Sequence, residues 1–253
     1  IKLEYIKSPT LSELWLYSEF DSDFWKNIIQ NLFQIIQKFK KYNAKVSVKE
    51  YNSIYFKKTS DRIDEVIADN EIFKDIFEED FIIINGEKLK NWSLMKSDIQ
   101  KRITKMYKKE DNSLIHGDLY FSNIFYDSTT KLFKLIDPRG KWGNGIGGDI
   151  KYDIAKIRHS IVGCFDIITN GLYTISYDKK NGIELSIFEP TNYQSICEEL
   201  DTNIQKNWNL DEIKIIEGLL FISMLPLHKD NFDRQLAFFS IGIKRLNEIF
   251  CDK

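Results

Sequence analysis

A short polar segment followed by two apolar strands constrains the fold of this chain more than any other feature. The segment runs from His116 to Asn123, and strands are expected at Ile124–Tyr126 and Lys131–Ile136. The turn-forming residues between these strands predict a β-hairpin. Asn123 precedes the first strand and Asp137 follows the second, so the hairpin would bring these two side chains together at its open end.

Three polar side chains stand out in this region. Asp118 supplies a carboxylate, Asn123 supplies an amide five residues later, and Asp137 supplies a second carboxylate. Phosphoryl transfer needs one carboxylate that orients the acceptor hydroxyl and accepts its proton. An amide oxygen and a further carboxylate suit the hard cation that bridges the phosphates of a nucleotide.

The pattern His-Gly-Asp-x-x-x-x-Asn with a downstream Asp resembles the aminoglycoside phosphotransferase and choline kinase family, which are small-molecule relatives of the protein kinases. The resemblance implies that Asp118 is the catalytic base and that His116 braces the catalytic loop. It also implies that Asn123 and Asp137 are magnesium ligands and thereby help to bind ATP. The implied activity is ATP- and magnesium-dependent transfer of a phosphoryl group to a hydroxyl of a small molecule.

The same resemblance implies a fold. It predicts an α+β structure over residues 1–253, the mostly helical large (C-terminal) lobe of a protein-kinase-like fold with small β-hairpins. Residues 148–156 resemble the family segment in which a Tyr-Asp-hydrophobic-Ala helix supports the catalytic loop. Asp153 would then accept hydrogen bonds from N–H groups of that loop.

The features of a small lobe are not recognisable in the sequence. Before residue 113 we find neither a phosphate-covering loop nor a strand lysine that could pair with a helix glutamate. Residues 1–9 resemble the hinge between lobes, and a strand at Leu3-Glu4-Tyr5-Ile6 would present its backbone to the adenine, so Glu4, Tyr5 and Ile6 are nucleotide-binding candidates. We therefore expect a large lobe whose small lobe is absent. Two alternatives stay open: a non-catalytic kinase-like binding module, and the phosphotransferase-like part of a bifunctional polysaccharide-biosynthesis protein.

Asp137-Pro138-Arg139-Gly140 stands where protein kinases have Asp-Phe-Gly. This version resembles family members found among bacterial capsule and surface-polysaccharide biosynthesis proteins, which implies a sugar, a sugar phosphate or an amino alcohol as acceptor. Arg139 could contact a substrate phosphate, because a guanidinium fork suits bidentate anions. Pairing with Asp149 or Asp153 is the favoured interpretation of this residue.

Aromatic residues near the motif are further candidates for acceptor binding. Trp142 and Tyr120 could stack on a sugar or enclose a quaternary amine. The glycine-rich run at residues 143–148 lacks the spacing of a dinucleotide-binding loop. We expect a flexible loop that borders the acceptor site.

Composition limits the classes of partner that we expect the protein to bind. The chain has 253 residues and a net charge of -2, and this balance argues against a nucleic-acid or anionic-membrane binder. The cysteines Cys164, Cys197 and Cys251 are odd in number and far apart, which favours a reducing compartment such as the cytoplasm. The longest apolar stretch, residues 218–228, is too short to span a bilayer. A nucleotide and a small hydroxyl compound are the expected partners.

Local patterns predict the other elements. Alternation predicts a second hairpin from Leu172–Tyr177 and Ile183–Phe188. Asn85-Gly86 predicts a tight turn after a short apolar strand. Helices are expected after a capping box at Thr10-Leu11-Ser12-Glu13, after Asp21-Ser22-Asp23, at Asp61–Phe77, Ser97–Lys108 and Tyr152–Ser160, and across 191–251 with an interruption near Pro226.

Overall fold

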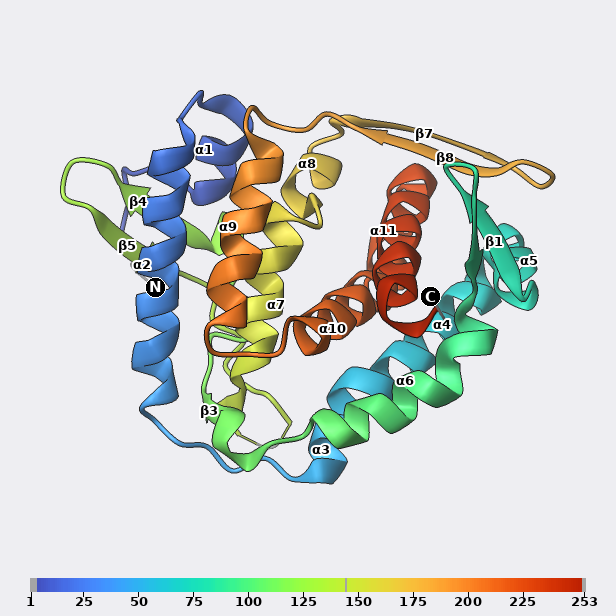
Figure 1. The fold of residues 1–253 in the computed structure, drawn as a ribbon, viewed down its shortest axis with the longest axis horizontal. Helices are drawn as coiled ribbons and strands as arrows, with labels where there is room; N and C mark the ends of the chain where they lie inside the picture. The colour runs from blue at the N-terminus through green and yellow to red at the C-terminus, as the bar shows by residue number, and fades with distance from the viewer. Residues whose placement is uncertain (1–3, 144, 252–253) are drawn as a thin grey trace.

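A computed structural model describes residues 4–143 and 145–251. These residues form an α+β fold that is mostly helical and carries three small sheets (Figure 1). The helices of the first half are α1 (Leu11–Tyr17), α2 (Ser22–Lys40), α3 (Val48–Asn52) with the π-helical turn η1 (Ser53–Lys57), α4 (Lys58–Asp69), α5 (Glu71–Glu78) and α6 (Trp92–Met106). The second half contains α7 (Ile150–Ile161), α8 (Phe165–Thr169), α9 (Tyr193–Gln205), α10 (Leu210–Ser223), the 3₁₀ turn η4 (Leu225–His228) and α11 (Phe232–Phe250).

Helices α1 and α2 begin where the capping residues in the sequence predict. Thr10 caps α1 by accepting from the Glu13 N–H, and the Glu13 carboxylate accepts from the Thr10 N–H, which completes the capping box. Asp21 caps α2. Along α2 the apolar side chains recur every three or four residues and are buried against the core.

The strands form three sheets, and two of these have two strands each. The predicted hairpin is present as β4 (Ile124–Asp127) and β5 (Leu132–Leu135). β3 (Asn112–Leu114) pairs antiparallel with β6 (Gly147–Asp149), which fixes the start of the His116–Asn123 loop beside the start of α7.

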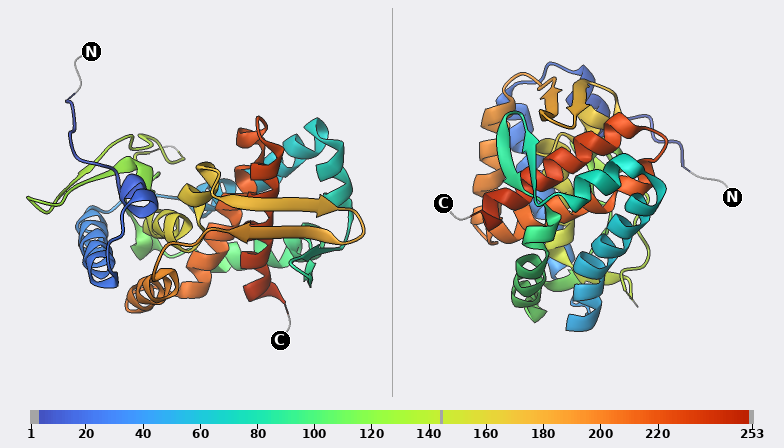
Figure 2. Two further views of the ribbon diagram at one scale, coloured as in Figure 1. Left: turned by 90° about the horizontal axis from the view of Figure 1, so that it is seen from above. Right: turned by 90° about the vertical axis from the view of Figure 1, so that its right-hand side faces the viewer.

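The third sheet has four strands. The predicted hairpins β1 (Phe81–Ile84) with β2 (Glu87–Lys90) and β7 (Tyr173–Asp178) with β8 (Gly182–Ile187) join through a parallel pairing of β1 and β8. The β7–β8 hairpin passes alongside α11 before it reaches β1 (Figures 1 and 2).

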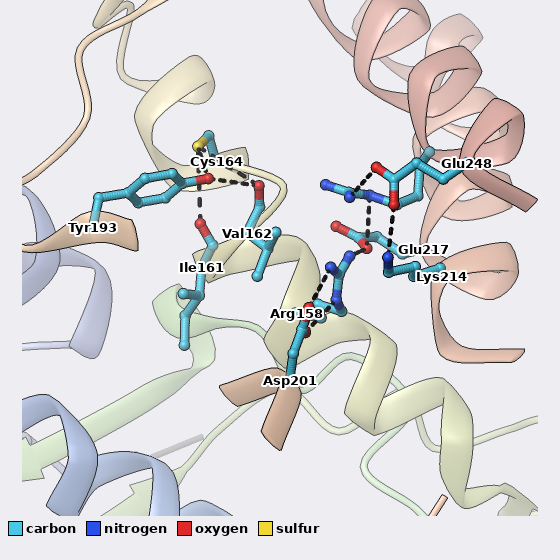
Figure 3. A network of polar contacts seen from close by, with 10 residues as sticks. Arg158, Ile161, Val162, Cys164, Tyr193, Asp201, Lys214, Glu217 and Glu248 are labelled. Atoms are coloured by element: carbon cyan, nitrogen blue, oxygen red, sulfur yellow. Dashed lines mark hydrogen bonds and ion pairs between the residues drawn. The ribbon is translucent and has the colours of Figure 1, made fainter. Parts of the chain in front are cut away.

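Helix α7 lies in the middle of the molecule, and every one of its residues is buried (Figure 1). Several of its charged side chains pair with charged groups on other parts of the chain. Arg158 makes a bidentate ion pair with Asp201 of α9, at 2.8 and 3.0 Å, and also binds Glu217 of α10 (Figure 3). Arg245 of α11 contacts the same Glu217 carboxylate, so one network of charges connects four helices.

Two expectations from the sequence concern a strand at the start of the chain and helices that could span a membrane. Residues 4–6 are not a strand; they form an irregular segment, while Leu3 lies outside the described residues. Within the part of the chain that the structure describes, no helix combines the length and apolar character needed to cross a membrane.

Candidate active site

The loop from His116 to Asn123 connects β3 to β4 and begins in a conformation that only glycine adopts easily. Gly117 has φ +79°, and a Cβ atom at this position would lie 2.8 Å from the Cβ of Arg139. A side chain at this position would therefore be strained and would collide with the segment that follows β5. The glycine of the motif lets the two segments that carry Asp118 and Asp137 approach each other.

Helix α7 holds both ends of this loop. The Asp153 carboxylate accepts from the His116 N–H at 2.7 Å and from the Gly117 N–H at 2.8 Å. Two turns further along the helix, the Ser160 hydroxyl accepts from the Phe121 N–H at 3.0 Å. Asp153 thus makes the contacts that the resemblance implied for it. Burial raises the pKa of Asp153 to about 7, although the two N–H donors act in the opposite direction.

His116 lies between the two carboxylate-bearing segments. Its ring is buried, and Nδ1 accepts from the Asp118 N–H at 3.3 Å. Burial lowers the pKa of His116, against the opposing influence of the Ile136 backbone and of nearby Asp118 and Asp137. A neutral ring in this position supports the loop and does not supply a charge.

Asn123 lies against Asp118. Its Nδ2 donates to the backbone carbonyl of Asp118 at 3.0 Å and approaches the Asp118 carboxylate at 3.5 Å. Because Nδ2 is the donor in both contacts, the amide oxygen is the atom that can ligate a cation. Asn123 is buried, whereas the Asp118 side chain is 39% exposed and lines a cavity of about 400 Å³.

The β4–β5 register brings Asp137 to the same place. Ile124 pairs with Leu135, and the Ile136 N–H donates to the Asn123 carbonyl at 3.1 Å. Asn123 and Asp137 therefore adjoin at the open end of the hairpin, and Asp137 lines the same cavity as Asp118. Asp137 has φ 52°, a left-handed conformation that turns the chain sharply before Pro138.

The donor set suits a magnesium ion that is shared with a substrate. Across residues 4–143 and 145–251, no group of three or more His, Cys, Asp or Glu side chains could enclose a metal by itself. Two carboxylates that line the cavity and an adjoining amide would leave the remaining positions around such an ion to phosphate oxygens and water. Magnesium prefers this arrangement, because it dehydrates reluctantly and binds through few protein ligands.

Lys156 belongs to the site but was not singled out from the sequence. Its Nζ lies 2.9 Å from the Asp118 carboxylate and 5.4 Å from the centre of the Tyr120 ring, and the residue is 7% exposed. It follows Asp153 by three residues, so both project from neighbouring positions of α7 toward the His116–Asn123 loop. That spacing is the signal in the sequence that could have identified it.

The acceptor candidates separate into two groups. Tyr120 and Arg139 line the cavity. Arg139 is exposed and donates to the Tyr152 hydroxyl at 3.0 Å, so its predicted pairing with Asp149 or Asp153 is wrong. Asp149 instead accepts from the Tyr55 hydroxyl.

Trp142 does not line the cavity beside Asp118. It is 2% exposed and packs edge-on against Tyr55 and Tyr152. Gly148 makes this possible, since a Cβ there would lie 2.6 Å from the indole. The predicted contact of Trp142 with a sugar or an amine is therefore wrong.

The segment proposed to meet adenine lies along the β4–β5 hairpin. Glu4 pairs with Lys134 of β5, Tyr5 is 82% exposed and Ile6 is half-buried. The Tyr126 N–H donates to the Pro9 carbonyl at 3.0 Å. The segment is thus adjacent to the hairpin that carries Asn123 and Asp137, although it contributes no strand of its own.

Comparison with known proteins does not identify a relative: no protein-family model matches the chain, and no match is found among curated proteins or solved structures.

Proposed function

We propose that this protein is an ATP- and magnesium-dependent kinase of a small hydroxyl compound, built as the large lobe of a protein-kinase-like fold. The observation that carries the proposal is that Asp118 and Asp137 line one cavity of about 400 Å³ and that Asn123 contacts Asp118 and adjoins Asp137. A cavity of this size suits a small molecule.

The residues have distinct roles in the proposed reaction. Asp118 orients the acceptor hydroxyl and takes its proton as the oxygen bonds to the γ-phosphorus, while the bond from that phosphorus to ADP breaks. Lys156 holds the Asp118 carboxylate in place through their 2.9 Å ion pair. Asn123 and Asp137 would hold the magnesium ion, which supplies charge neutralisation at the phosphates. We further propose that the backbone of residues 4–6, beside the hairpin, meets the adenine.

The test is a transfer assay with the protein in its natural full length. We would incubate it with magnesium and γ-labelled ATP and screen sugars, sugar phosphates and amino alcohols for incorporated label. Asp118→Asn is expected to lower kcat about 10³-fold, because it removes the base and preserves the shape of the side chain.

Asp98→Asn is the matched control, since Asp98 lies on the exposed face of α6 and pairs only with Lys101 among the described residues. It should keep the full rate. Absence of transfer to every acceptor class, or an unchanged rate in Asp118→Asn, would contradict the proposal.

A further inference from the structure

The cavity beside Asp118 extends to one side of the catalytic carboxylates only. Its walls come from the catalytic loop, α4, α7, α8, the end of α10 and η4. Among the described residues that line it, none belongs to residues 4–16 or to the β4–β5 hairpin. In Figure 1 this hairpin lies on one side of α7, and α10 and α4 lie on the other. The cavity therefore points away from the proposed adenine side, toward the place of an acceptor.

Cations dominate these walls. Lys58 and Arg62 project from α4, Arg139 from the loop after β5, and Lys156 from α7. The only carboxylates among the lining residues that the structure describes are Asp118 and Asp137, which the proposed reaction uses. His228 of η4 completes the lining on the far side.

Three of these cations lack a carboxylate partner within ion-pair distance in the described part of the chain. Arg62 donates to the Ser223 carbonyl, and Arg139 donates to the Tyr152 hydroxyl. Lys58 lies over the face of the Tyr152 ring, 5.6 Å from its centre, and Arg139 lies 5.7 Å from the same centre. Glu65, which influences Arg62, is exposed and does not line the cavity.

The pKa directions report a positive potential in this cavity. Burial lowers the pKa of Lys58; the Tyr152 phenol opposes this effect, and the neighbouring cations Arg139, Arg62 and Lys156 lower the pKa further. Burial acts to raise the pKa of Tyr152, but Lys58, Lys156 and Arg139 lower it. Three cations that share one cavity without ion-pair partners repel one another, and a bound anion would offset that cost in free energy.

We infer that the hydroxyl acceptor is itself an anion: a sugar or polyol that carries a phosphate or a carboxylate, bound by Lys58, Arg62 and Arg139. The identification of the bound anion as the acceptor rests on the proposed function. The anion site itself rests on the geometry of the cavity. It separates the acceptor classes left open by the sequence, because a cationic amino alcohol would be repelled by the same walls.

Direct binding tests the inference without any phosphoryl transfer. We would titrate the natural full-length protein by calorimetry with glucose 6-phosphate, glucuronate and glucose, in the absence of nucleotide and magnesium. The two anions should bind at least 10-fold more tightly than neutral glucose, and the better of the two identifies phosphate or carboxylate as the recognised group. Equal binding of glucose and both anions would overturn the inference.

Variants locate the site. Arg139→Gln and Lys58→Gln should each weaken binding of the anion about 10-fold or more, since each removes a charge-assisted contact. Lys57→Gln is the matched control, because Lys57 precedes Lys58, is 68% exposed and pairs with Asp61 away from the cavity. Unchanged affinity in both cavity variants would refute the assignment.

Two further arms separate this inference from the proposed function. Asp118→Asn should still bind the anion. If the original protein binds anions but transfers no phosphoryl group, that result would refute the proposed kinase activity and would leave the proposed anion site intact. A saturating non-hydrolysable ATP analogue with magnesium should leave the anion bound. Displacement of the anion by the analogue would assign the cavity to the nucleotide phosphates and overturn the inference.

Discussion

Replacement of Glu217 by Gln should destabilise the protein by about 3 kcal/mol. The Glu217 side chain is fully buried, and its Oε2 contacts both Arg158 and Arg245 (Figure 3). The amide keeps the shape but leaves two guanidinium groups beside a neutral side chain. Loss of one partner of a buried ion pair costs roughly 3–5 kcal/mol. Because Asp201 still binds Arg158 and Glu248 still binds Arg245, we expect the lower end of that range.

In a protein of 253 residues this loss of folding free energy is measurable as a lower melting temperature, Tm. A change of 1 kcal/mol shifts Tm by roughly 2–4 °C at this size, so Tm should fall by about 6–12 °C in thermal unfolding followed by circular dichroism. Glu248→Gln is the matched control at the rim of the same network, where the side chain is 38% exposed and its pairs contribute less than about 1 kcal/mol. Equal losses in Glu217→Gln and Glu248→Gln would refute the argument that burial decides the cost.

Two further predictions concern α7. Lys156→Met should lower kcat about 10- to 100-fold with little change in Tm, because the ion pair positions Asp118. Lys156→Arg should restore part of the rate. An unaltered kcat of Lys156→Met in steady-state kinetics would contradict this role. His159 is buried between Phe165 and Phe221, and burial holds its pKa well below 6.5, so the unfolded chain binds a proton there that the folded protein does not. Stability should therefore fall as the pH drops below about 6.5, by up to about 1.4 kcal/mol per pH unit from this group, and urea titrations of His159→Phe should show a shallower acid slope than the original protein.

The elements that short-range patterns determine were predicted from the sequence. Asn85 and Gly86 both have positive φ and form the tight turn between β1 and β2, as their types indicate. The pairing of β1 with β8 was not predicted, because it joins Ile84 to Ile183 across the chain. It depends on Gly182, where a Cβ would lie 2.2 Å from the Ile83 carbonyl oxygen. No local sequence pattern predicts such a contact.

The same distinction applies to the site. Asn123 and Asp137 were expected to adjoin because a single hairpin connects them, and the register bears this out. Trp142 was misplaced because its burial depends on Tyr55, a residue far away in the sequence and within the π-helical turn η1. Lys58 was missed for a similar reason, since only the packing of α4 beside α10 brings it to the cavity that Asp118 lines.

Helix α7 explains how the candidate site can be held firmly by a loop that contains only one short 3₁₀ turn, η3 (Phe121–Asn123). Asp153 and Ser160 accept from backbone N–H groups at the two ends of the loop, and Lys156, between them, holds the Asp118 carboxylate. Arg158 ties the same helix to α9 and α10 through buried charges. A displacement of α7 would therefore have to break loop contacts and core ion pairs together. In the proposed reaction this coupling fixes the position of the Asp118 carboxylate, and a small displacement of that carboxylate would lower the rate steeply.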